Sequence, residues 1–523
     1  MDSATVEIIK NYFISTCEEM GIALKKSSFS PNIKERADHS CALFDSKGRL
    51  IAQAEHIPVH LGSMPTSVKQ ILNEFKVEEV EQGDVFILND PYRGGTHLPD
   101  ITLLTPAFYN EKLVGFAVSR AHHSDVGGAS AGSMPIQAYE IFQEGLRIPP
   151  IKLVKRGKLQ RDILEIILAN VRTPIERSGD ISAQIAANNL GCRRIKELID
   201  KYDLHTLLEA CENLLDYSER LMRKQIKNIP KGVFEAVDYL DDDGQGEEMI
   251  PIRVKVAVSD EEIEVDYTGT HKQVRGPLNA VEPVTLSATY YVIRTLTDPE
   301  APINDGLYRP IKVKAPLGTI VNPLFPAAVA GGNVETSQRI VDALYLAFSK
   351  ALPEKVPAAS SGSMSNITIG GLDHRSGLGF AYYETIAGGS GAGADFDGEN
   401  AIHTHMTNTM NTPVEALEHA YPITIEAYEV RRGSGGKGLH RGGDGVRRIY
   451  RIECEEAALT ILSDRNKIRP WGLCGGEAAQ AGRCIYVDRF GRSTVVPSKI
   501  SLRVFRGDRF IVETPGGGGF GLT

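Results

Sequence analysis

The residues from 89 to 102 read Asn89-Asp-Pro-Tyr-Arg-Gly-Gly-Thr-His97-Leu-Pro-Asp100-Ile-Thr102. Turn-forming residues dominate this stretch, and Pro99 disfavours a helix between the histidine and the second aspartate. Short apolar runs flank it, at residues 85–88 and 101–105, and such runs bounded by turn residues are typical of strands. The stretch therefore predicts two strands joined by a loop from which His97 and Asp100 project.

The rest of the chain alternates strand-like and helical patterns. Apolar residues recur at helical intervals in residues 4–26 and, over a longer distance, in residues 159–227. Short apolar runs between turn residues fill residues 41–118, with one helix expected near 67–75, and return after Pro230. A further helix is expected over 338–350, with Asn333 or Thr336 as its N-cap.

These patterns predict an α+β fold, a mixed strand-rich body with a helical hairpin or bundle insertion and a Gly-rich C-terminal strand region. We expect three segments. They are an N-terminal strand-and-loop region with a metal site (1–155), a helical segment (156–230) and a C-terminal α+β region (231–523). Because the sequence contains no long linker and no repeat, an alternative is one interlocked domain.

Composition excludes several classes of function. The 523 residues contain 58 Lys and Arg against 67 Asp and Glu, a net charge of −9, which disfavours nucleic acid as a partner. No stretch approaches the roughly 20 mainly apolar residues of a membrane span, and the first residues lack the pattern of a secretory signal. Seven cysteines without a C-x-x-C pair are typical of reduced thiols. We therefore expect a cytoplasmic protein with no membrane partner.

A second group of candidate ligands lies one strand and turn later, in Ser119-Arg-Ala-His122-His123-Ser-Asp125-Val-Gly-Gly128. Six of the 13 histidines fall within the first 123 residues, and Asp38 precedes an early strand. A lone histidine is more often a hydrogen-bonded structural residue, but this clustering favours a metal site. Imidazole and carboxylate donors suit Mn²⁺, Fe²⁺ or Zn²⁺. Asp125 is expected to stabilise a turn or to form a hydrogen bond with one of the metal ligands.

Three other motifs carry weaker signals. Residues 433–438 and 516–521 match G-x-G-x-x-G, but neither opens a helix after a strand, as the dinucleotide fingerprint requires. Close backbone packing is expected there, and no ATP site. If His403-Thr-His405 forms a strand, both imidazole rings lie on one face of it. This geometry suits contact with a metal or a substrate, and a structural role is the alternative. The serine-rich residues 358–365 lack the G-x-S-x-G elbow of a serine hydrolase.

Nine blocks in one order along the chain resemble the hydantoinase B family. This family includes the β subunits of ATP-dependent N-methylhydantoinases, the corresponding half of 5-oxoprolinases and the larger subunits of acetone-type carboxylases. The blocks are residues 35–40, 53–64, 89–102, 122–128, 329–337, 397–408, 435–445, 470–476 and 513–519. Together they extend over the whole chain.

The resemblance implies a mononuclear metal site whose ligands are Asp38, His97, Asp100 and His122, and it selects His122 over His123. It also implies a partner, a hydantoinase A-type ATPase subunit in an A2B2 heterotetramer. That subunit would use ATP to phosphorylate the carbonyl oxygen of a small cyclic amide, a lactam or a hydantoin. The B-type chain would then carry the activated intermediate forward.

We hypothesise that this chain hydrolyses the phosphorylated amide with water activated by one divalent ion, Zn, Mn or Fe. His60 or His123 would act as a base or would orient a ligand. Arg93, Arg120 or the amides of the Gly-Gly turns would hold the phosphate. Two alternatives are a subunit of an ATP-dependent ketone carboxylase and a non-catalytic scaffold for the ATPase partner.

Overall fold

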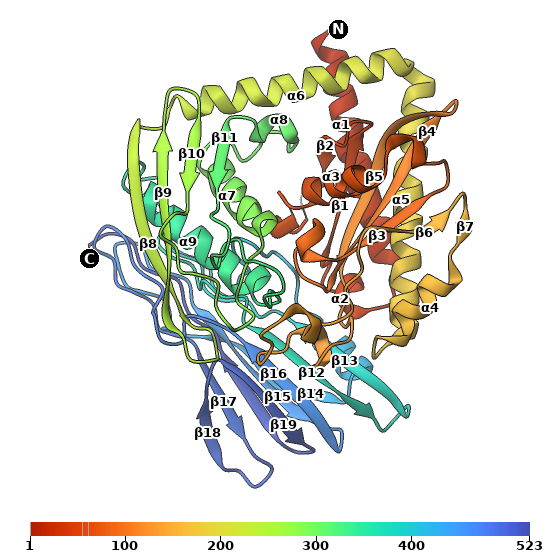
Figure 1. The fold of residues 1–523 in the computed structure, drawn as a ribbon. Coiled ribbons are helices and arrows are strands. Elements are labelled where there is room, and N and C mark those ends of the chain that lie inside the picture. The colour runs from red at the N-terminus through yellow and green to blue at the C-terminus, as the bar shows by residue number, and fades with distance from the viewer. Residues whose placement is uncertain (1, 55, 61, 523) are drawn as a thin grey trace.

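Figure 1 presents the computed structural model, which describes residues 2–54, 56–60 and 62–522. Among these residues the strands form four sheets. The N-terminal sheet, with helices beside it, occupies one part of the molecule, and the strand-rich C-terminal part (blue) lies below it in this view. The fold is the mixed α+β class predicted from the sequence.

The first sheet contains the stretch 89–102 and has the order β2-β1-β5-β4-β3-β6-β7. Its strands are β1 (His39–Asp45), β2 (Leu50–Gln53), β3 (Val85–Leu88), β4 (Asp100–Tyr109), β5 (Lys112–His122), β6 (Ile151–Lys155) and β7 (Lys158–Leu159). Asn110 and Glu111 join β4 to β5 with φ of 45° and 63°, as two-residue hairpins require. Strand β4 continues through Pro106, where the sequence pattern suggested an end.

Two long helices cover one face of this sheet. They are α1 (Ser3–Ser27), within one residue of the helix expected over 4–26, and α5 (Pro174–Tyr202). Two polar residues of α5, four positions apart, reach carbonyls of β4. Gln184 Nε2 donates to Ile101 O (3.1 Å) and Asn188 Nδ2 to Leu103 O (3.0 Å). The match arises because four helical residues and two strand residues advance by similar lengths.

The expected helical segment is also present. Helix α4 (Arg161–Ala169) precedes α5, and α6 (Leu204–Ile226) follows it after a sharp break. Asp203 forms that break with φ of 64°, and its carboxylate accepts the Thr206 N–H to cap α6. Among the described residues, none of the helices combines the length and apolar character needed to cross a bilayer.

A second sheet, of order β11-β10-β9-β8, faces helices α7 and α9, which lie between it and the first sheet (Figure 1). The elements are β8 (Gly232–Asp242), β9 (Glu248–Val258), β10 (Ile263–Asp266), β11 (Ile311–Lys314), α7 (Glu282–Leu296) and α9 (Ser337–Phe348). The remaining α-helices between residues 2 and 348 are α2 (Pro31–Lys34), α3 (Met64–Glu74) and α8 (Asp305–Tyr308). One apolar cluster includes Phe116 of β5, Val254 of β9 and Ile340 of α9, so the two sheets share a core.

The start of α9 differs from the prediction that Asn333 or Thr336 caps this helix. No described side chain caps this helix, because a wide π-helical turn, Gly332–Thr336, precedes it and its carbonyls already accept the first N–H groups. The Thr336 hydroxyl donates instead to Leu278 O. The other cap candidate, Asn333, points toward the first sheet.

The C-terminal part is built from the third and fourth sheets, of orders β13-β12-β16-β19 and β14-β15-β20-β17-β18. The elements are β12 (Asn366–Asp373), β13 (Leu378–Glu384), α10 (Val414–Ala420), β14 (Ile423–Arg431), β15 (Gly445–Ile452), β16 (Glu456–Leu462), β17 (Arg483–Val487), β18 (Ser493–Val496), β19 (Lys499–Phe505) and β20 (Arg509–Glu513). Apolar residues of both sheets, such as Ile461 and Phe510, form one core cluster.

The Gly-rich C-terminal segment threads between three loops. Gly517 N donates to Gly443 O (2.9 Å), Gly518 N to Ala359 O (2.7 Å), and Gly518 O accepts from Ala392 N (3.0 Å). Gly517 O also accepts from Gly436 N (2.9 Å). A Cβ atom at Gly517 would overlap the Ser390 carbonyl. Both G-x-G-x-x-G matches are therefore explained by backbone-to-backbone packing.

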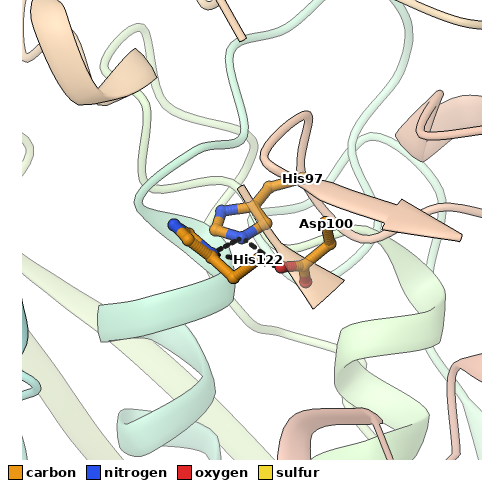
Figure 2. A group of neighbouring side chains, drawn as sticks. All are labelled: His97, Asp100 and His122. Carbon is orange, nitrogen blue, oxygen red and sulfur yellow. Dashed lines mark hydrogen bonds and ion pairs between the residues drawn. The ribbon is translucent and has the colours of Figure 1, made fainter. Parts of the chain in front are cut away.

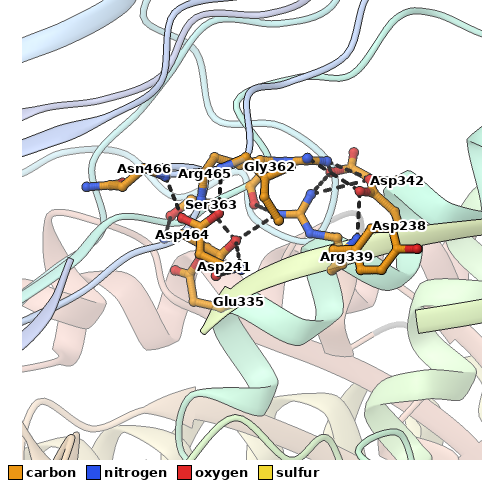
Figure 3. A network of polar contacts seen from close by, with 12 residues as sticks. Asp238, Asp241, Glu335, Arg339, Asp342, Gly362, Ser363, Asp464, Arg465 and Asn466 are labelled. Atoms are coloured by element: carbon orange, nitrogen blue, oxygen red, sulfur yellow. Dashed lines mark hydrogen bonds and ion pairs between the residues drawn. The ribbon is translucent and has the colours of Figure 1, made fainter. Parts of the chain in front are cut away.

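A network of buried charges joins the second sheet, α9 and the loop after β16 (Figure 3). Arg465 Nη2 lies 2.6 Å from Asp238 Oδ2 and 2.7 Å from Asp342 Oδ2. Asp464 lies 3.2 Å from Arg339 Nη2 and 3.0 Å from Lys499 Nζ. These side chains are almost fully buried. Their ion pairs connect elements that are far apart in the sequence.

All seven cysteines lie in the described part of the chain, and six of them are buried. Burial raises the pKa of Cys192 and Cys211 to about 12 and that of Cys484 to about 11. Cys474 alone among the seven is exposed. The buried thiols behave as small apolar side chains.

Candidate metal centre

Three strand ends meet at one edge of the first sheet. Strand β5 is antiparallel to both β1 and β4, so its last residue, His122, lies beside the first residues of those strands. Asp100 is paired directly with His122. The segment before β4 is folded by Asn89, whose side-chain amide donates to Leu98 O (2.7 Å). This fold returns His97 to the same edge, as Figure 2 shows.

His97, Asp100 and His122 converge on one point. His97 Nε2 lies 3.0 Å from Asp100 Oδ1 and 3.2 Å from His122 Nδ1, which is itself 3.2 Å from Asp100 Oδ1. Donor atoms that share an ion at bond lengths of roughly 2.0–2.1 Å lie about 3.0–3.4 Å from one another. The three side chains are 0%, 1% and 3% exposed. Their spacing and chemistry therefore fit a divalent metal ion.

The protonation of these groups suits ligation. His97 Nδ1 lies 3.2 Å from Ala330 O, a contact that places the proton on Nδ1 and leaves the Nε2 lone pair free. Burial lowers the pKa of His122 and so favours its neutral form. Burial opposes ionisation of Asp100, but the neighbouring His97, His122 and His60 hold the pKa of its carboxyl well below the usual range.

Two residues that the sequence analysis did not assign to the site also contact it. Asn333 reaches it from the turn before α9, with Nδ2 3.1 Å from His97 Nε2. The ring of Tyr383 stacks on His122 at 4.3 Å between centroids, and its hydroxyl donates to Asn366 Oδ1 (2.8 Å). The only earlier signal for Asn333 was its place in the block 329–337.

Asp38 immediately precedes β1 at the same sheet edge. Its backbone carbonyl accepts the His122 N–H (3.0 Å), and its carboxylate lies 3.7 Å from Arg36 Nη1. Among the described residues, the donor atoms that lie within 4.8 Å of one another are those of His97, Asp100 and His122. Asp38 lies beside this group of three donors.

His60 lies beside the candidate metal ligand Asp100. Ser40 Oγ accepts the Ile57 N–H (3.2 Å), so its hydroxyl is free to donate to His60 Nδ1 (2.8 Å). His60 Nε2 then carries a proton and faces Asp100 Oδ2 at 3.5 Å. Glu55 and Leu61, which belong to the same sequence block, lie outside the described residues.

The other predicted catalytic residues have partners away from the cluster. His123 faces α5, where its Nε2 lies 3.0 Å from Gln184 Oε1, because successive residues of an extended chain point in opposite directions. Burial and the Arg177 guanidinium lower the pKa of His123 to about 4. The Arg120 guanidinium donates to the hydroxyls of Thr102, Ser63 and Ser67. Arg93 pairs with Glu74.

The expected strand at His403 and His405 is wrong. Both residues lie in an irregular segment between β13 and α10, and His405 has φ of 60°. Contacts with distant residues fix this segment, such as Val59 N to Met406 O (3.3 Å). His405 is nevertheless buried and His403 half-buried, and desolvation lowers the pKa of His403 to about 4.

Two solved structures share the whole fold. The ATP-dependent caprolactamase from Pseudomonas jessenii matches with a TM-score of 0.93 and 29% identity, over 100% of this chain and 91% of that chain. A nucleotide-free acetone carboxylase structure matches with a TM-score of 0.91 over 99% of this chain and 76% of that chain. At 19% identity, this second match shows the fold alone.

Sequence relatives extend over the full chain as well. An uncharacterised protein of Methanocaldococcus jannaschii is 47% identical over 523 residues, covering 100% of this chain and 91% of that protein. The 5-oxoprolinase of Dictyostelium discoideum is 38% identical over 534 residues. The chain is matched completely but spans only 40% of that enzyme. The family described as Hydantoinase B/oxoprolinase matches residues 2–523, and the chain therefore belongs to the hydantoinase B/oxoprolinase family.

Proposed function

We propose that this chain is the metal-dependent subunit of an ATP-dependent amidohydrolase that opens a cyclic amide, a lactam or a hydantoin. The convergence of three buried nitrogen and oxygen donors, His97, Asp100 and His122, carries the proposal. The names of its relatives support the substrate class, since a 5-oxoprolinase and a caprolactamase both act on lactams. Asp38, at the same sheet edge, is proposed as a fourth ligand.

The proposed chemistry divides between two subunits. A hydantoinase A-type ATPase partner, in an A2B2 assembly, would phosphorylate the amide oxygen and so turn a poor electrophile into an imidate-like carbon with a good leaving group. A divalent ion, Zn, Mn or Fe, would supply Lewis acidity and lower the pKa of a water toward neutrality. Only an intermediate activated in this way would be hydrolysed by this chain.

The residues of this chain have defined tasks in that scheme. His97, Asp100 and His122 hold the ion, and Ala330 O fixes the ring of His97 through Nδ1. Thr96 Oγ1 donates to Asp100 Oδ2 (2.6 Å), and His60 Nε2 faces the same oxygen. His60 therefore orients Asp100. The contacts of His123 and Arg120 favour a structural role for both.

The first test is elemental analysis of the purified chain and of its His97→Ala, Asp100→Ala and His122→Ala variants. Each protein is then combined with the ATPase subunit and assayed for ATP-dependent ring opening. We expect about one ion per wild-type chain, and loss of ion and ring opening in the variants, since each removes a ligand.

His123→Asn is the matched control, because His123 is adjacent in sequence but faces α5. It should retain the ion. A wild-type chain without metal, or ligand variants with full activity, would contradict the proposal. ATP-dependent carboxylation of a ketone without ring opening would assign the chain to the carboxylase branch instead.

A further inference from the structure

The turn before α9 places the amide side chain of Asn333 against the candidate metal ligands His97 and Asp100. Gly331 N and Gly332 N both donate to Pro277 O (2.8 and 3.1 Å), which anchors the start of the π-helical turn Gly332–Thr336. Such wide turns occur frequently at functional sites. Asn333, the second residue of the turn, is 4% exposed and points at His97 and Asp100.

The distances of Asn333 match those of the three donors. Its Nδ2 lies 3.1 Å from His97 Nε2 and 3.5 Å from Asp100 Oδ2. These values resemble the 3.0–3.2 Å separations among His97, Asp100 and His122. Its Oδ1 is buried and has no hydrogen-bond partner among the described residues. The amide group thus occupies a donor position additional to His97, Asp100, His122 and the proposed ligand Asp38, but it directs its hydrogens toward the point where the ion would bind.

A bound cation would reverse the preferred orientation of this amide. The contact of His97 Nδ1 with Ala330 O leaves one lone pair on Nε2, and Asn333 Nδ2 is placed to donate to it. That lone pair cannot serve both an N–H donor and a cation. Amide hydrogens aimed at a cation are also repelled, whereas the carbonyl oxygen of an amide is a hard donor that suits divalent ions. Rotation of the amide by about 180° exchanges the two atoms without moving the backbone.

We propose that Asn333 is a ligand of the metal centre through its amide oxygen. This inference rests on the proposed function in one respect only, that His97, Asp100 and His122 hold a divalent ion. Asn333 brings an oxygen without a charge, so the ion keeps more of its Lewis acidity than it would with a further carboxylate. Asn333 is therefore a determinant of both the affinity and the reactivity of the ion.

The test compares Asn333→Ala with Asn333→Asp by titrating Mn²⁺, Zn²⁺ or Co²⁺ alone into the full chain. Asn333→Ala removes the oxygen and should weaken binding about 10- to 100-fold, the range typical of lost metal-site partners. Asn333→Asp retains an oxygen at the same reach and cannot donate a hydrogen bond. It should bind the ion at least as tightly as the wild type, while turning over more slowly, because the added charge reduces Lewis acidity.

The matched control is Ser337→Ala, which removes the hydrogen bond from Ser337 Oγ to Asn333 O (2.7 Å) and leaves the amide in place. Its metal affinity should equal that of the wild type. Thermal melting of each variant shows whether it is folded. A metal-loaded crystal structure should place Oδ1 roughly 2.0–2.3 Å from the ion.

Two results would overturn the inference alone. One is equal loss of affinity in Asn333→Asp and Asn333→Ala, which would make Asn333 a donor that orients His97. The other is a metal-loaded structure in which Asn333 Nδ2 still faces the ligands. A folded wild-type chain that binds none of the three ions would overturn both this inference and the proposed function.

Discussion

Glu144 is a buried carboxyl group that supports the segment orienting His97. Its Oε1 accepts the N–H groups of Val329 and Ala330 (2.8 Å each), and the carbonyl of Ala330 faces His97 Nδ1. Burial outweighs these two hydrogen bonds and raises the pKa of Glu144 from 4.5 to about 8. The group is therefore protonated in the folded chain at neutral pH.

Glu144→Gln should stabilise the protein at pH 7 and change little at pH 4. Between pH 4.5 and 8 the unfolded chain releases this proton and the folded chain keeps it, so wild-type stability falls as pH rises. The difference between variant and wild type should grow by up to about 1.4 kcal/mol per pH unit in this window. Urea denaturation at pH 5, 6, 7 and 8 measures it.

Glu78→Gln, at an exposed position, serves as the control for the exchange of a carboxyl for an amide. A pH-independent effect of Glu144→Gln would show that Glu144 is ionised in the folded chain.

The residues of the site differ in how far the sequence could predict them. The types and spacing of His97 and Asp100 indicated a metal site because both lie in one short stretch of sequence, although Asp100 is the first residue of β4. Spacing could not choose between His122 and His123. The family resemblance selected His122, and the pairing of Asp100 with His122 gives a physical reason for that choice. Asn333 lies 233 residues from Asp100, and only long-range packing brings them together. Asp38 as a ligand stays a prediction.

At the scale of elements, the Gly-rich C-terminal segment acts as a connector. Its backbone bonds to three separate loops and leaves no room for side chains. The segment therefore depends on glycine for close approach, independently of any ligand.

Gly517→Ala should destabilise the protein by about 3 kcal/mol or more, because the new Cβ overlaps the Ser390 carbonyl and neither backbone can move freely. Gly379→Ala is the control, since the nearest atom to its Cβ would lie at 3.6 Å. It should change stability by no more than about 0.5 kcal/mol. Denaturant unfolding of both variants tests this, and equal stability of the two would show that the loops around Gly517 can yield.

Helices were the most predictable elements. The helix expected over 4–26 forms at Ser3–Ser27, because its apolar periodicity is local and directly reflects the buried face. The segment around His403 and His405 was not predictable. Its conformation depends on bonds to residues far away, such as Met410 N to Arg36 O (3.0 Å), and no local pattern encodes them.

At the scale of the whole molecule, the three sequence segments share their interior. One apolar cluster includes Phe116, Ile226 and Val254, one from each of the three expected segments. The buried charges around Asp464 and Arg465 link further elements. We propose that the chain is one interlocked body rather than three separable domains.

Unfolding in urea should accordingly be a single transition. Trp471 is the only tryptophan, and its Nε1 donates to Asp238 (3.0 Å) within the charged network. Its fluorescence should therefore change at the same urea concentration as far-UV circular dichroism, which reports helices throughout the chain. Two separate midpoints would contradict this expectation.

Removal of one charge in the network should be costly. Asp464→Ala leaves the buried Lys499 with only the more distant carboxylate of Asp242 (3.8 Å) and removes one of the carboxylates around Arg339, and should destabilise the chain by about 3–5 kcal/mol. Glu456→Ala, which breaks an exposed pair with Arg503, should cost less than about 1 kcal/mol. Similar losses in both variants would mean that the network is hydrated.

The distribution of cysteines gives the chain a chemical reporter. Six thiols are shielded in the interior, and Cys474 faces solvent. Ellman's reagent should therefore release one equivalent of chromophore from the native protein and seven after denaturation. Stepwise release would identify a region that opens before the rest, and a maleimide dye would label the native molecule at a single position.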